Sequence, residues 1–248
     1  MLERFQGDRA VLLGAVAIFS IGLTTSGYAL SDGLRRWKLA EQRSITVRGV
    51  SERNVTADLA TWSVSFAHTG IELGSVQQSV DQQARVVRAF LLRAGFQPAE
   101  VTDSNISLSR DQPTDNDGNP VGPETVTVRR SIELRTNDVM KARAAYAAQA
   151  ELLRNGVELS GSGISYTFTK LNDLKPEMIA EATRHARLSA QQFANDSGAS
   201  VGSIKTASQG YFSIGPRDGS DEEGGDGTDS PFQKVRVVTT VDYDIDAD

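Results

Sequence analysis

The chain has 248 residues, enough for one large or two small domains, and its 39% hydrophobic and 23% charged content is typical of a folded protein. Its formal net charge of -6 disfavours nucleic acid as a partner, because phosphate binding needs a basic surface. The absence of cysteine excludes disulfides, thiolate nucleophiles and cysteine-ligated metal sites.

The N-terminal segment, residues 1–30, contains the uncharged run Ala10–Leu30. As a helix this run would span roughly 30 Å, the thickness of one hydrocarbon core. We therefore predict one transmembrane anchor followed by a polar stalk at residues 31–44. The alternative is a signal peptide with Val11–Leu23 as its apolar region, removed from the mature protein.

The charges on either side of this run predict how the chain is oriented in the membrane. The basic residues before it are Arg4 and Arg9, and those after it are Arg35, Arg36, Lys38 and Arg43. By the positive-inside rule, this excess after the run would leave the body in the cytoplasm.

The body of the chain alternates predicted strands and helices. Strands are expected at residues 45–50, 61–68, 101–110, 125–135, 164–170, 204–214 and 233–245, and helices at 75–94, 139–154 and 176–195. The first two strands flank a short polar break, and Trp62, Val64 and Phe66 alternate as in a half-buried strand. Apolar residues recur at helical spacing in the first helix: Val76, Val80, Val87 and Leu91.

The ends of the helices carry recognisable signals. A glycine follows each of them: Gly95, Gly156 and Gly198. Glycine takes the left-handed conformation that ends many helices without steric strain. Asn137 or Asp138 is expected to cap the second helix, and Pro176 suits the first turn of the third.

These elements predict an α+β fold, with an antiparallel sheet covered by about three helices behind the membrane anchor. A weak repeat of strand, helix, glycine and strand pair runs from residue 61 to 135 and again from 164 to 245. It indicates either an internal duplication or the general self-similarity of α+β chains.

Three segments of the body resemble the SIMPL domain family. The first is a strand, a glycine, a polar turn and an Ala-Asp-x-Ala motif, here Val47, Gly49, Ala57, Asp58 and Ala60. The others are Gly95–Leu108, with its Ser104-Asn105 pair, and the closing strand from Val235. The resemblance covers residues 45–248, expected to form one SIMPL-like domain. It implies an exported envelope protein, which decides the orientation in favour of a body outside the cytoplasm.

Catalytic signals are scarce in the sequence. It contains no P-loop, G-x-S-x-G, H-E-x-x-H or dinucleotide fingerprint, and only two histidines. His185 follows Glu177 and Glu181 on one helix face, but zinc needs three or four ligands, so a solvated face is the simpler interpretation. We expect a protein that is not an enzyme and has no cofactor; a hydrolase of unrecognised type is a further alternative.

Two acidic loops are the candidate cation sites. In the first, Asp115, Asp117 and Glu124 lie at spacings close to a calcium-binding loop, although Pro113 stands where its first aspartate is needed. A polar turn is the competing interpretation, since Asn-Asp-Gly supplies a positive φ. The second loop, residues 217–230, is rich in glycine and acidic residues and is typical of a solvated segment.

The sequence and the resemblance together predict a non-enzymatic protein anchored in the inner membrane with its body in the periplasm. Its expected mode of action is homo-oligomeric assembly or protein interaction, in envelope or oxidative-stress defence as the resemblance implies. The alternative location is the periplasm after signal cleavage. The alternative function is a module that binds a cation or small ligand through its acidic loops.

Overall fold

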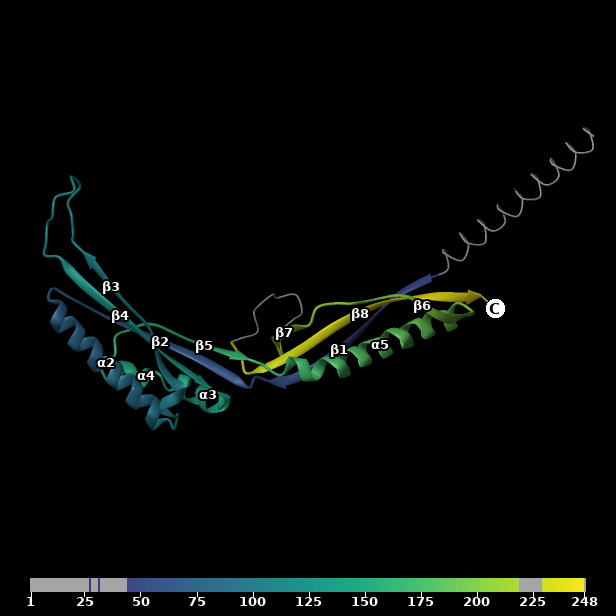
Figure 1. Ribbon diagram of the computed structural model, residues 1–248, viewed down its shortest axis with the longest axis horizontal. Helices are drawn as coiled ribbons and strands as arrows, with labels where there is room; N and C mark the ends of the chain where they lie inside the picture. The colour runs from purple at the N-terminus through teal and green to yellow at the C-terminus, as the bar shows by residue number, and fades with distance from the viewer. Residues whose placement is uncertain (1–26, 28–30, 32–43, 219–228, 248) are drawn as a thin grey trace, which may run out of the picture. The chain divides into compact units, whose positions relative to one another are not determined.

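The computed structural model describes residues 27, 31, 44–218 and 229–247, whose elements are labelled in Figure 1. Nearly all of the expected membrane anchor and stalk, and most of the acidic loop at 217–230, fall outside these residues. Within the described part, no helix is both long and apolar enough to span a membrane.

The described residues confirm the α+β prediction, but their strands form two antiparallel sheets where one was expected, beside four α-helices where about three were expected. The described residues divide into two compact units. Unit 1 contains residues 44–49, 182–209 and 239–247, and unit 2 contains 50–181, 210–218 and 229–238.

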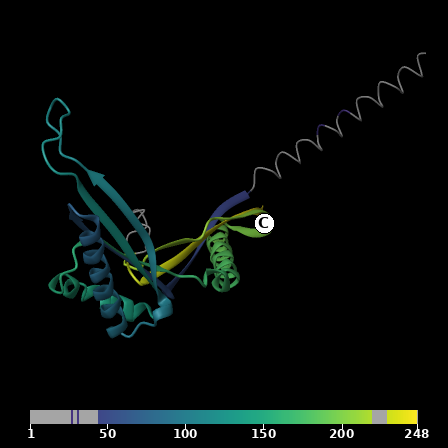
Figure 2. The ribbon, with the colours of Figure 1, turned by 60° about the vertical axis from the view of Figure 1, so that its left-hand side comes forward.

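Unit 2 is built on a sheet with the strand order β3-β4-β2-β5. The strands are β2 (Leu59–Gly70), β3 (Val101–Asp111), β4 (Thr125–Thr136) and β5 (Leu159–Thr167). One face of this sheet is covered by α2 (Leu73–Arg93), α3 (Val139–Ala147) and α4 (Ala150–Arg154), as Figures 1 and 2 show. A short 3-10 helix, η1 (Pro98–Glu100), leads into β3.

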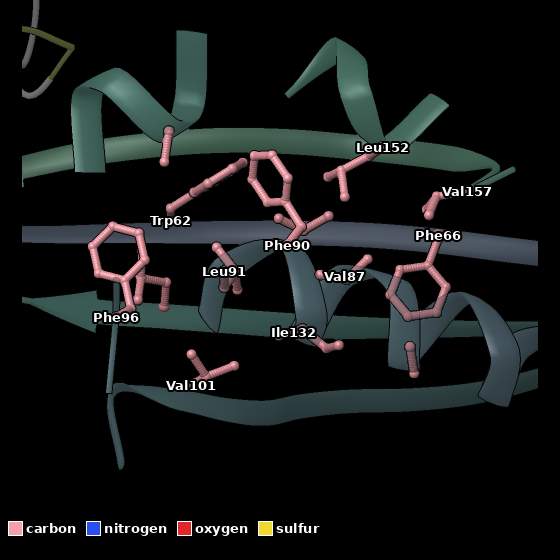
Figure 3. Packing of buried hydrophobic residues seen from close by; sticks show 14 of the residues in the cluster. Trp62, Phe66, Val87, Phe90, Leu91, Phe96, Val101, Ile132, Leu152 and Val157 are labelled. Atoms are coloured by element: carbon pink, nitrogen blue, oxygen red, sulfur yellow. The ribbon is translucent and has the colours of Figure 1, made fainter. Parts of the chain in front are cut away.

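The core of unit 2 lies between this sheet and its helices (Figure 3). Trp62 is fully buried and meets Phe90 and Tyr146 edge to face, with ring centroids 6.2 and 5.5 Å away. Such edge-to-face pairs add stability beyond the area that they bury. The apolar positions predicted for the first helix are all buried on α2, which confirms its periodicity.

Unit 1 contains the N-terminal half of β1 (Ser44–Thr56), most of α5 (Leu171–Asp196) and β6 (Ala199–Gln209), and the end of β8 (Phe232–Ala247). The sheet order is β1-β8-β6, and β7 (Ser213–Pro216) pairs with the part of β8 that belongs to unit 2. One face of α5 has a row of buried alanines: Ala182, Ala186, Ala190 and Ala194. Small side chains at this four-residue spacing let a helix lie close to a strand.

The polar break expected after residue 50 is much shorter than predicted. β1 continues to Thr56, so only Ala57 and Asp58 separate it from β2. The polar residues stay in the strand because they find partners: Glu52 pairs with Lys234 at 3.8 Å and with Arg236 at 3.4 Å.

Two helix boundaries also differ from the prediction. The expected helix at 139–154 is two helices, because i to i+3 hydrogen bonds at Gln149 and Glu151 interrupt the α-helical pattern. α5 begins at Leu171, so Pro176 lies inside the helix and not in its first turn. The glycines after the helices are confirmed by their positive φ angles, and Asp138 is the cap of α3.

Candidate functional site: the outer edge of β3 and its hairpin

β3 is an edge strand of the unit 2 sheet, hydrogen-bonded on one side to β4. Val101 is its one buried residue, and every other position of the strand is exposed. Ile106 and Leu108 lie opposite Arg130 and Val128 of β4, on the side of the sheet that faces the core. They are nevertheless 63% and 47% exposed. Exposed apolar side chains on an unpaired strand edge are typical of a surface that pairs with another chain.

The loop that joins β3 to β4 is organised by Asp115. One oxygen of its carboxylate accepts backbone N–H groups from Asp117 at 3.0 Å and Asn119 at 2.8 Å. The other accepts the Asn119 side-chain amide at 3.2 Å. The backbone and side-chain hydrogen bonds from Asn119 hold the pKa of Asp115 below its usual value. Both oxygens of this carboxylate therefore serve the turn.

The other two candidate calcium ligands are placed differently. Glu124 lies 3.6 Å from Arg110 across the base of the hairpin. Asp117 is exposed, and its backbone N–H serves the Asp115 turn. Among the residues that the structure describes, no group of three or more acidic or histidine side chains is placed to hold a metal ion. Calcium binding by Asp115, Asp117 and Glu124 stays a prediction.

The carboxylates on α5 that precede His185 are bound within unit 2. Glu177 lies 2.9 Å from Arg53, and Glu181 lies 3.2 Å from the same guanidinium. Glu181 also accepts a 2.6 Å hydrogen bond from the buried Ser51 hydroxyl. These contacts tie the helix to β1, a role that the sequence pattern alone did not indicate.

The Ala-Asp-x-Ala motif occupies the turn between β1 and β2. Ala57 and Ala60 are buried, at 4% and 1% exposure, and both belong to the core of unit 2. The Asp58 carboxylate accepts the Thr169 backbone N–H at 2.7 Å and its hydroxyl at 2.9 Å. The Asp58 carbonyl accepts the Asn137 side-chain amide at 2.7 Å. One residue thus joins three segments that are distant in sequence.

The electrostatics of Asp58 agree with this joining role. Burial opposes its ionisation, but the hydrogen bonds from Thr169 and the charge of Lys170 outweigh that cost. The pKa of Asp58 is therefore lower than usual. The motif therefore has a structural role, because the carboxylate of its aspartate accepts hydrogen bonds from Thr169.

The fold and this surface define an α+β protein whose unit 2 sheet has β3 as an exposed edge strand. The family model SIMPL, described as a protein of unknown function (DUF541), matches residues 45–243. The chain belongs to the SIMPL family.

The chain was also compared with curated proteins and with solved structures. None of the curated proteins compared with the chain matches it. A solved structure described as a hydrolase from Listeria innocua is 12% identical and aligns over 79% of this chain and 91% of that chain, with a TM-score of 0.15. At that score the likeness carries no argument about fold or function.

Proposed function

We propose that this SIMPL protein is not an enzyme and acts by assembling with copies of itself through the outer edge of β3. The observation that supports this most strongly is the pair Ile106 and Leu108, exposed on an edge strand 11 residues long. Unpaired backbone groups and apolar side chains on one strand provide both the hydrogen bonds and the buried area for strand pairing.

The sequence of β3 suits pairing with itself. In an antiparallel pair centred on Ser107, Ile106 lies opposite Leu108 of the partner subunit, and the two-fold axis repeats this contact. Directly opposite apolar residues on one face of a strand pair stabilise it by about 0.2–1 kcal/mol per pair. The same axis gives an isologous dimer, the commonest form of homo-oligomer.

The wider setting belongs to the same proposal. Ala10–Leu30 anchors the chain in the inner membrane, and the body lies in the periplasm; secretion with signal cleavage is the alternative. The length of the apolar run supports the anchor. Resemblance to exported relatives supports the location and a part in envelope or oxidative-stress defence. An anchor would also raise the local concentration of the bodies and so favour their pairing.

Substitution of Ile106 by lysine tests the interface. The full chain in detergent is compared by sedimentation velocity with Ile106→Lys and with Leu188→Lys, a matched change at a residue on α5 that is 61% exposed. A charge on the strand edge blocks pairing, so we expect Ile106→Lys to lose the assembly that wild type and Leu188→Lys keep. Equal assembly of all three proteins would refute pairing through β3.

A further inference from the structure

The ring of Phe232, the first residue of β8, makes cation–π contacts with two arginines. The guanidinium carbon of Arg143 on α3 lies 5.4 Å from the ring centroid, and that of Arg217 lies 5.1 Å from it. Both distances are within the range of a cation–π contact. All three residues belong to unit 2.

Within the described part of the chain, the two positive charges are not balanced by a neighbouring acid. Among the residues that the structure describes, neither guanidinium forms an ion pair with a carboxylate, although Asp218 directly follows Arg217. Arg217 donates from Nη2 to the Val55 carbonyl at 3.0 Å, and its buried Nε–H has no acceptor among the described residues. Two like charges on one ring repel each other, and a buried donor without an acceptor is destabilising.

The surroundings of the pair are partly sheltered from water. The Tyr166 side chain is 2% exposed. Burial raises the pKa of its hydroxyl, while the nearby charge of Arg143 acts in the opposite direction. Gln233 is buried beside them and donates to the Tyr166 carbonyl at 2.9 Å. Charge interactions are stronger in such a setting than in open solvent.

We propose that Arg143 and Arg217, held on Phe232, form a binding site for an oxyanion, a phosphate or a carboxylate group. The planar guanidinium donates several N–H groups in a fork that matches the oxygens of either group. A bound anion would relieve the repulsion between the two arginines. Arg143 is exposed, so a ligand can reach its guanidinium from solvent. The site does not depend on assembly through β3.

Isothermal titration of the full chain in detergent tests the site, with inorganic phosphate in one arm and acetate in the other. Sodium chloride keeps the ionic strength constant, because screening alone would otherwise change the signal. We expect saturable binding at one site per chain in at least one arm, and the arm that binds identifies the oxyanion. Arg143→Gln should weaken it at least tenfold.

Arg154→Gln is the matched control, since Arg154 is an exposed arginine in the last turn of α4. It should bind as wild type does. Because Arg143 is exposed, its variant should fold, which an unchanged circular dichroism spectrum and melting temperature would verify. Absence of saturable binding in both arms, or an equal loss in Arg154→Gln, would overturn the proposal.

Discussion

Gly49 of β1 packs against the backbone of α5. A Cβ atom added there would lie 1.8 Å from the Ala182 carbonyl oxygen and 2.5 Å from the Ala186 nitrogen. Both neighbours are backbone atoms, which cannot rotate away. We therefore expect Gly49→Ala to lower the free energy of unfolding by at least about 1–3 kcal/mol, the usual cost of overpacking. Urea denaturation measures this change.

Gly163→Ala is the control for that substitution. A Cβ at Gly163 meets no atom within 4 Å, so this variant should be close to wild type in stability. Equal stability of the two variants would contradict the close packing of the strand on the helix.

Asp58 should make the stability of the fold depend on pH. Its pKa is lower in the folded chain than in the unfolded one, so its contribution is complete above the unfolded pKa of about 3.9. That contribution is lost as the pH falls through the folded pKa. Asp58→Asn should cost about 1–2 kcal/mol at neutral pH and less in acid, measured by urea denaturation across the pH range. Asp117→Asn is the control; a constant difference between wild type and Asp58→Asn at every pH would contradict the account.

At this scale the sequence indicated the motif but not its role. The family resemblance identifies Asp58, and the structure pairs it with Thr169, which is 111 positions away. No periodicity reports a contact over such a distance. Arg143 and Arg217 escaped notice for the same reason, because Phe232 brings them together only in the folded chain.

At the scale of elements, Arg130 connects β4 to α2 and to β3. Its guanidinium lies 2.8 Å from Asp81 on α2 and 3.1 Å from Asp103 on β3. Hydrogen bonds from Arg130 lower the pKa of Asp103, and Arg88 adds a further contact at 2.7 Å. The network holds the edge strand and the helix to the same sheet.

Arg130→Met should weaken this connection. It keeps an unbranched apolar stem but leaves both carboxylates without this guanidinium, so we expect a loss of about 1 kcal/mol in unfolding free energy, larger at low salt. Arg110→Met is the control, because Arg110 and Glu124 are half exposed and 3.6 Å apart. Denaturation curves at two salt concentrations measure both losses. An equal loss of unfolding free energy in the two variants at both concentrations would contradict the network.

The strands and helices themselves were largely predictable, because alternation and helical spacing are local signals. The predicted boundaries were wrong where tertiary contacts determine the end of a strand or helix. Charged residues after position 50 suggested a break, yet Glu52 is kept in β1 by Lys234 and Arg236 of β8. The repeat proposed from sequence stays a prediction; its two matched strands are direct neighbours, with Trp62 opposite Ile164.

At the scale of the whole molecule, the proposed assembly depends on the position of β3 at the edge of its sheet. Local sequence cannot reveal it, because whether a strand lies at an edge depends on the order of all strands in the sheet. Spacing alone predicts the candidate metal residues, whereas the structure places the Asp115 carboxylate in the turn of its own hairpin. The candidate interface could be recognised only after the sheet order was known.

The mass of the full chain in detergent, measured by light scattering after size exclusion, tests the central claim most directly. Assembly through β3 predicts a discrete multimer, with a mass that is an integral multiple of 26.7 kDa after the detergent is subtracted. It also predicts that the multimer dissociates on dilution, as mass action requires. A monomer at every concentration would contradict the claim that this SIMPL protein works by pairing its strand edges.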